Sequence, residues 1–84
     1  MCTMIVENAE IFGSGKGPQG WFTLGQVNVS YDHPFHVSLE HALNIDFVNA
    51  AAGVGARVAV ELSAESARQL VWLITRALER GENL

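Results

Sequence analysis

The side chains best suited to chemistry lie close together in the sequence. All three histidines, His33, His36 and His41, fall within nine residues, and the lone cysteine is Cys2. Imidazole and thiolate groups are the ligands that zinc, copper, iron and nickel accept. A histidine that faces a core also keeps a lone pair free for general base catalysis. We therefore expect His33, His36, His41 and Cys2 to be candidate metal ligands, and His33 and His41 to be candidate catalytic groups.

A structural interpretation of the same residues stays open. The spacing H-x2-H-x4-H matches no strong metal signature, unlike paired C-x2-C motifs. On this interpretation, His33 and His36 flank a turn formed by Asp32 and Pro34, and His41 is a hydrogen-bonded core residue. A metal-free pocket for a small anionic molecule is the third alternative.

Composition limits the class of protein. The chain has 84 residues and 9.1 kDa, which predicts one domain over residues 1–84. It is 49% hydrophobic and 17% charged with a net charge of −4, so a disordered chain and a nucleic-acid binder are not expected. No apolar run reaches the roughly 18 residues of a membrane helix, and the start lacks a signal-peptide pattern. These features predict a cytoplasmic protein with no membrane partner.

The small size also predicts self-association. A domain of this length buries only about 60–65% of the surface that its unfolded chain exposes. The apolar residues of this chain exceed what one thin core can hide, and a single cysteine cannot form an internal disulfide. We therefore expect a homodimer.

Apolar residues alternate with period two over four segments, at about residues 3–12, 21–33, 41–48 and 56–62. This period is typical of strands with one buried face. The first segment alternates poorly, which predicts an edge strand or a bulge. The glycine-rich residues 13–20 resemble part of a phosphate-binding loop, but Glu10 occupies the first glycine position of that motif and Gly17 its hydroxyl position. We expect a flexible turn there.

The period changes to 3.6 after Ser63, which is a good helix N-cap. One apolar stripe follows, made by Ala67, Leu70, Val71, Ile74, Ala77 and Leu78. Gly81 ends the predicted helix, whose length matches that of the strands. The sequence therefore predicts an α+β fold, β-β-β-β-α, with a four-stranded antiparallel meander and one C-terminal helix packed on its apolar face. Trp72 points away from the stripe, toward a sheet edge or another subunit.

A meander would bring the candidate chemistry to one rim of the sheet. Sequential strands usually neighbour one another, so the chain start, the 32–36 connection and the helix entry share one end. A register of the two middle strands that places His33 opposite His41 also places Tyr31 opposite Leu43, so that apolar residues pair with each other. The residues expected at this rim are Cys2, Tyr31, Asp32, His33, His36, His41 and Ser63. Asp32, Glu40 or Asp46 would orient an imidazole through its second nitrogen.

Several segments are similar to those of one protein family. They are Met-Cys-Thr at residues 1–3, Gly-Ser-Gly-Lys-Gly-Pro at 13–18 with Gly-Trp-Phe at 20–22, and the core segments Asp-His-Pro-Phe-His at 32–36 and Glu-His-Ala-Leu-Asn-Ile-Asp-Phe at 40–47. Together they resemble a family of short, mostly actinobacterial proteins of unknown function. The resemblance spans nearly the whole chain and implies a bacterial cytosolic origin and one compact domain, but no residue role.

The expected function is therefore that of a small bacterial domain that binds a transition metal in a histidine-rich pocket at one rim of the sheet. The bound metal would also allow the domain to catalyse a reaction of small-molecule metabolism. One alternative is a metal-free module that binds a small molecule or performs acid–base catalysis. The other is an interaction domain that uses Trp72 and an exposed sheet edge.

Overall fold

The computed structural model describes residues 5–84. It has an α+β fold with a four-stranded antiparallel sheet, a second two-stranded sheet and one C-terminal helix, which confirms the predicted class. Thr3, where the first strand was expected to begin, lies outside the described residues. The elements in chain order are β1 (Ile5–Glu10), β2 (Ser14–Gly17), β3 (Gly20–Thr23), β4 (Gln26–Asp32), β5 (Ala42–Val48), the 3₁₀ helix η1 (Ala50–Ala52), β6 (Arg57–Leu62) and α1 (Ala64–Gly81).

The main sheet has the strand order β1-β4-β5-β6, and all its pairings are antiparallel. Ile45 lies at its centre, opposite Val29 on β4 and Val60 on β6. Because side chains alternate between faces along a strand, this register collects the large apolar residues on one face. These residues are Val27, Val29, Tyr31, Leu43, Ile45, Phe47, Val58, Val60 and Leu62.

The opposite face of the sheet is polar. Its residues on β4, β5 and β6 include Asn28, Ser30, Asp32, Asn44, Asp46, Arg57 and Glu61. The guanidinium of Arg57 donates from Nε and Nη2 to the two carboxylate oxygens of Asp46, at 2.9 and 3.1 Å. This hydrogen-bonded pair raises the pKa of Arg57 above its usual value. The two faces therefore have different chemistry, as the strand periodicity predicts.

Strand β1 is an edge strand, as its poor alternation predicted, and all six of its residues are exposed. It pairs with β4 so that Glu7 stands opposite Val29, on the apolar face, while Val6 stands opposite Ser30 on the polar face. The polar and apolar positions are thus reversed at Val6 and Glu7, whereas Ile5 and Ala9 stay on the apolar face. A carboxylate on the apolar side suits only a strand that stays in contact with water.

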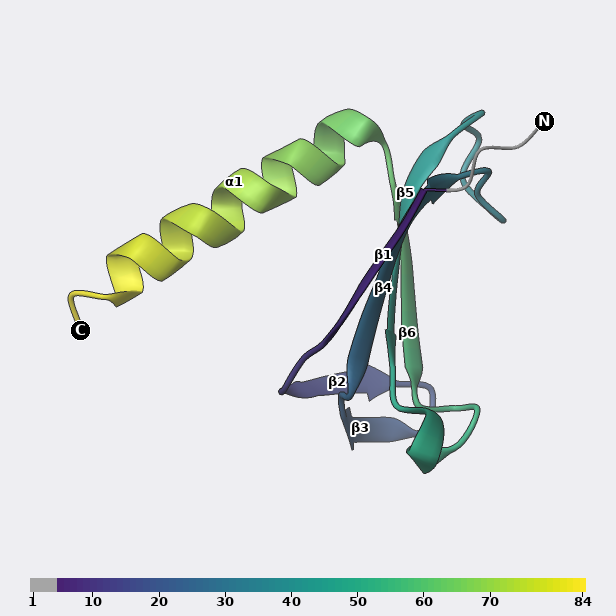
Figure 1. Cartoon of the computed structure of the whole chain (residues 1–84), viewed down its shortest axis with the longest axis horizontal. Helices are drawn as coiled ribbons and strands as arrows, with labels where there is room; N and C mark the ends of the chain where they lie inside the picture. The colour runs from purple at the N-terminus through teal and green to yellow at the C-terminus, as the bar shows by residue number, and fades with distance from the viewer. Residues whose placement is uncertain (1–4) are drawn as a thin grey trace.

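The glycine-rich segment is a hairpin and not the flexible turn that its composition suggested. β2 and β3 pair from Ser14↔Thr23 to Gly17↔Gly20, and Gly20 adopts a φ of +111° at the turn. The predicted strand over residues 21–33 is accordingly divided into β3 and β4. A Cβ on Gly17 would lie 3.0 Å from the carbonyl oxygen of Gly55, so the hairpin approaches the chain before β6 too closely for a side chain. The hairpin lies at the lower end of the main sheet (Figure 1).

Helix α1 begins as predicted. The Ser63 hydroxyl accepts a hydrogen bond from the backbone N–H of Ser66 at 3.1 Å, and Glu65 lies in the first turn. This arrangement satisfies a free N–H group and complements the helix dipole. Ser63 alone separates the last residue of β6 from the first residue of α1. The cap and the short connection together fix the direction in which the helix leaves the sheet.

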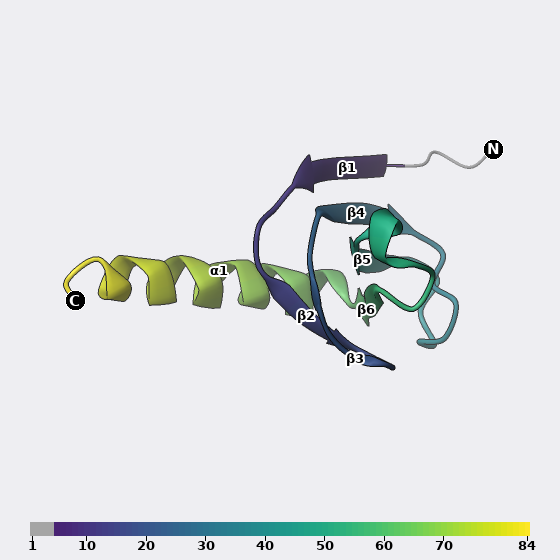
Figure 2. The ribbon, with the colours of Figure 1, turned by 90° about the horizontal axis from the view of Figure 1, so that it is seen from below.

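The prediction that the helix packs across the apolar face of its own sheet is wrong. Only the start of α1 lies near the sheet, and the rest extends away from it (Figures 1 and 2). No residue of α1 is buried; Val71, Ile74 and Leu78 are 64%, 50% and 67% exposed. Trp72 is also exposed, with the Arg76 guanidinium 5.3 Å from its ring centroid. The direction set at Ser63 prevents the contact that the matching lengths suggested.

An open apolar groove of about 590 Å³ therefore separates the sheet from the helix. Its walls are the apolar face of β4 and β5 and the apolar stripe of α1. The lining residues are Val29, Tyr31, Leu43, Ile45, Ala64, Ala67, Arg68, Leu70, Val71 and Ile74. In the part of the chain from residue 5 onward, the only buried hydrophobic residues are the small Ala42 and Ala56.

Candidate functional site

Two of the candidate histidines meet at the rim of the apolar face. The β4–β5 register ends with Asp32 opposite Ala42, so His33 and His41 follow as the next opposed pair. Their rings stack with centroids 5.1 Å apart and planes 19° apart. The ring of Tyr31 also stacks on His41, with centroids 5.7 Å apart. The predicted opposition of His33 to His41 and of Tyr31 to Leu43 is confirmed.

A main-chain contact fixes the orientation of His33. Its ring Nδ1 lies 2.8 Å from the carbonyl oxygen of Glu40. Since a carbonyl oxygen only accepts, Nδ1 carries the proton in this contact, and in the neutral ring the lone pair is on Nε2. Asp32 was expected to orient an imidazole, but its carboxylate accepts the backbone N–H of His33 at 2.7 Å. The Glu40 carbonyl thus orients the ring in place of a side-chain carboxylate.

The imidazoles are exposed to solvent. His33, His36 and His41 all have exposed side chains, so the interpretation of His41 as a core residue is wrong, and so is the expectation of histidines that face a core. The rings of His33 and His41 lie just beyond the last paired residues of β4 and β5, Asp32 and Ala42. An ion or small molecule can therefore reach the His33–His41 pair directly from solvent.

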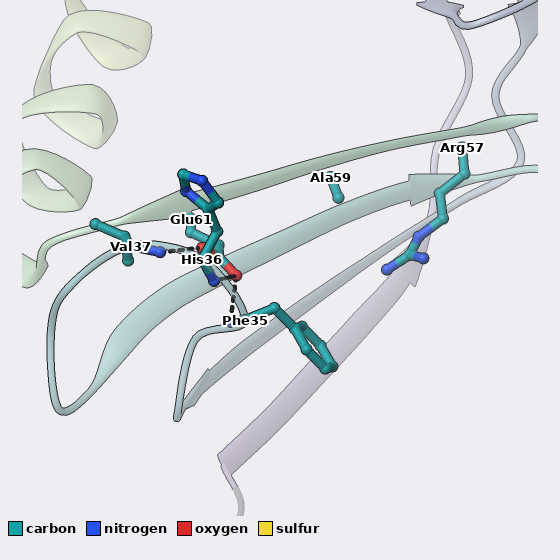
Figure 3. A pocket seen from close by; sticks show the side chains of 6 residues that line it. All are labelled: Phe35, His36, Val37, Arg57, Ala59 and Glu61. Atoms are coloured by element: carbon teal, nitrogen blue, oxygen red, sulfur yellow. Dashed lines mark hydrogen bonds between the residues drawn. The ribbon is translucent and has the colours of Figure 1, made fainter.

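The connection that carries His36 is held on a different part of the sheet. Three consecutive backbone N–H groups donate to the Glu61 carboxylate on β6: Phe35 at 2.6 Å, His36 at 3.1 Å and Val37 at 2.9 Å (Figure 3). Glu61 belongs to the polar face, whereas the stacked rings adjoin Tyr31 on the apolar face. His36 lines a pocket there with Arg57, Ala59 and Glu61 (Figure 3).

The three N–H groups have an electrostatic consequence. Hydrogen bonds from Val37 and Phe35, with smaller contributions from His36, lower the pKa of the Glu61 carboxyl group below its usual value. A carboxylate that accepts several backbone hydrogen bonds favours its charged form. Glu61 thereby anchors the 33–41 connection, and this contact was not predicted from the sequence. The only feature of the sequence that relates to this contact is the glutamate at a polar-face position of β6.

Protonation of Glu61 is expected to release this connection at low pH. Since the pKa of Glu61 is lower in the folded state, its stabilising contribution is complete above the unfolded-state pKa, about 4.3, and is lost as the pH falls through the folded-state pKa. NMR amide shifts of Phe35, His36 and Val37 should follow one common titration below about pH 4.3. Glu61→Gln should abolish that titration. Glu79→Gln, on exposed α1, should leave the titration of the three amide shifts unchanged. If the titration persists in Glu61→Gln, the titrating group is not Glu61.

The remaining candidate ligands are not all brought together. Cys2 lies outside the described residues. Within residues 5–84, no three histidine, cysteine, aspartate or glutamate side chains lie close enough to hold a metal ion. The structure therefore joins His33 and His41 in one pair and places His36 at the Glu61 contact. Because Ile5 stands opposite Tyr31, the chain enters β1 at the end of the sheet that carries the pair.

Comparison with known proteins gives the family of the chain. The family DUF6295, described as a family of unknown function, matches residues 1–83. The chain belongs to this family. The resemblance to a family of unknown function is thus confirmed for nearly the entire sequence. No curated protein and no solved structure matches this DUF6295 chain. Over residues 5–84 it has no helix with the length and hydrophobicity needed to cross a membrane.

Proposed function

We propose that this protein binds a transition-metal ion through His33 and His41, with Cys2 as a third ligand. The observation that carries the proposal is the stacked imidazole pair, 5.1 Å between centroids, at a solvent-exposed rim. Two nitrogens that bind one tetrahedral zinc ion at about 2.0–2.1 Å are roughly 3.3 Å apart. Because the Glu40 contact holds the His33 ring, the His41 side chain is the one that would turn to direct its nitrogen to an ion on Nε2 of His33.

The hydrogen bond of His33 supports the same role. A ligating histidine usually donates its other ring N–H to a carbonyl or carboxylate, which fixes the tautomer and the ring direction. His33 makes this contact with the Glu40 carbonyl at 2.8 Å. Nε2 of His33 is then the nitrogen available to the metal. The contact thus favours a ligand role for His33 over a role as a mere turn residue.

Cys2 is the preferred third ligand because of chain connectivity. Ile5 is paired with Tyr31, beside the histidine pair, and Cys2 precedes Ile5 by three residues. Three residues span at most about 11 Å, a distance that allows the thiolate to reach this rim. His36 is less suitable, because Glu61 anchors its backbone at the polar face. Thiolate and imidazole together favour zinc or copper over magnesium or calcium.

Titration of chelator-treated protein with Zn²⁺ tests the proposal. Calorimetry should give one ion per chain. His33→Ala and His41→Phe should weaken binding by at least about 100-fold, because losing a ligand costs more than the 10- to 100-fold effect of losing an outer partner. The phenylalanine keeps an aromatic ring for Tyr31 to stack on, so a loss there reports the missing nitrogen. Cys2→Ser should also weaken binding.

His36→Ala is the matched control, since it removes the third histidine without touching the pair. It should leave the Zn²⁺ affinity within about threefold of the parent, below the effect expected even from an outer-shell change. Absence of Zn²⁺ binding by the parent protein would overturn the proposal. Equal losses in all three histidine variants would show that the ion binds nonspecifically to surface imidazoles.

A further inference from the structure

We propose that the apolar groove between the sheet and α1 is filled by α1 of a second copy of this chain, so that two copies exchange helices reciprocally. The groove has two apolar walls, one from the sheet and one from the helix, and neither is covered. Neither His33 nor His41 lines the groove, so this inference does not depend on metal binding.

The surface area of the single chain indicates how much a partner must cover. The accessible surface is 6740 Å², whereas a compact monomer of 9.1 kDa exposes about 4,900 Å². The radius of gyration is 14.3 Å, against about 11.8 Å for a compact chain of 84 residues. The excess of about 1,800 Å² lies within the range that each subunit of an obligate dimer buries, about 1,000–2,500 Å².

The helix cannot fill the groove of its own chain. Ser63 is the sole residue between β6 and α1, and its hydroxyl is bound to the N–H of Ser66 at 3.1 Å. Folding α1 back onto its own sheet would require a reversal at this one residue and loss of the cap. Connections between strands and helices usually have two or more residues. A helix from another molecule needs no such change.

The chain itself carries both complementary surfaces. The apolar stripe of α1, which includes Leu70, Val71 and Ile74, has the length of the strands that form the apolar sheet face. Opposite charges are available at the contact as well. Arg68 of α1 lines the groove, and Glu7 of β1 lies on the apolar face of the sheet. An exchanged helix brings its arginine to the sheet face that carries Glu7 of the other copy, and a twofold axis repeats the contact.

The mass in solution is the first test. Sedimentation equilibrium should give twice the 9.1 kDa of one chain. Ile74→Asp places a charge in the groove and should raise the dimer Kd by roughly 100-fold or more. Gln69→Asp adds the same charge on α1 away from the groove lining and should leave Kd within about threefold. Circular dichroism of each variant reports whether α1 is still formed.

The second test separates helix exchange from other dimers. Isotope-filtered NMR on a mixture of labelled and unlabelled parent chains should show contacts between Ile45 methyls of one copy and Ile74 methyls of the other. A monomeric parent protein overturns the proposal, even where a different protein is found to cover the groove. A dimer in which the Ile45–Ile74 contact is intramolecular, or is missing, also overturns it.

Discussion

The thermal unfolding midpoint is expected to rise with protein concentration, by roughly 4 °C for each tenfold increase. When folded dimers unfold to separate chains, tenfold dilution costs about 1.4 kcal/mol per dimer. Dividing this by the unfolding entropy typical of two 84-residue chains gives the expected shift. Differential scanning calorimetry over a hundredfold range of concentration measures it directly.

Ile74→Asp provides the control for this concentration dependence. If the variant stays folded as a monomer, its midpoint should be lower than that of the parent and independent of concentration. Gln69→Asp, with its charge away from the groove lining, should retain the parent's slope. A parent midpoint that does not change with concentration would show that the single chain is stable with its groove open. It would thereby contradict the exchange of helices.

Truncation of the central apolar residue is expected to have the largest effect on stability among truncations of one apolar side chain to alanine. Ile45 lies on β5 between Val29 and Val60, and it also lines the groove. Ile45→Ala should lower the free energy of unfolding by about 2 kcal/mol, the lower end for such a change, because the residue is half-buried in the single chain. Urea unfolding followed by circular dichroism measures the change.

Val54→Ala is the matched comparison for Ile45→Ala. Val54 lies in the connection before β6 and is fully exposed. Its truncation should change the free energy of unfolding by less than about 0.5 kcal/mol. If helix exchange buries Ile45 more deeply, the loss at Ile45 should exceed 2 kcal/mol and approach the upper end of the range, about 5 kcal/mol. A loss no greater than that at Val54 would place Ile45 outside the core.

The local features of this fold could be predicted because short-range interactions decide them. Alternation of polar and apolar residues located β4, β5 and β6, and Ser63 located the start of α1 through its own hydrogen bond. The hairpin of β2 and β3 was missed because β2 consists of serine, glycine and lysine, a composition typical of turns. Gly17 of this hairpin also approaches the Gly55 carbonyl, a contact between residues distant in the sequence.

The direction of α1 was the largest error in the fold. An apolar stripe indicates that one face of a helix is buried, but it does not specify whether the same chain or another molecule packs against it. A sequence-based argument assigns the stripe to the nearest apolar surface, the sheet of the same chain. The single-residue connection at Ser63 opposes that assignment. The error therefore concerns chain geometry at one residue and not the amphipathic character of the helix.

The candidate site was predicted in part for the same reason. His33 and His41 extend the side-chain phase of two paired strands, so their opposition follows from register alone. His36 lies in an irregular connection, where no periodicity determines position. Its location depends on backbone N–H groups that bind Glu61 from another strand. Backbone hydrogen bonds of this kind carry no residue-type signal.

The carboxylates of β1 also affect colloidal behaviour. β1 is an outer strand of the sheet, with Glu7 on one face and Glu10 on the other. Any foreign strand that extended the sheet here would place these charges inside a continuous layer, close to its own side chains, at an unfavourable desolvation cost. Glu7 and Glu10 thus disfavour the open-ended, fibre-like growth of the sheet by addition of strands at this edge.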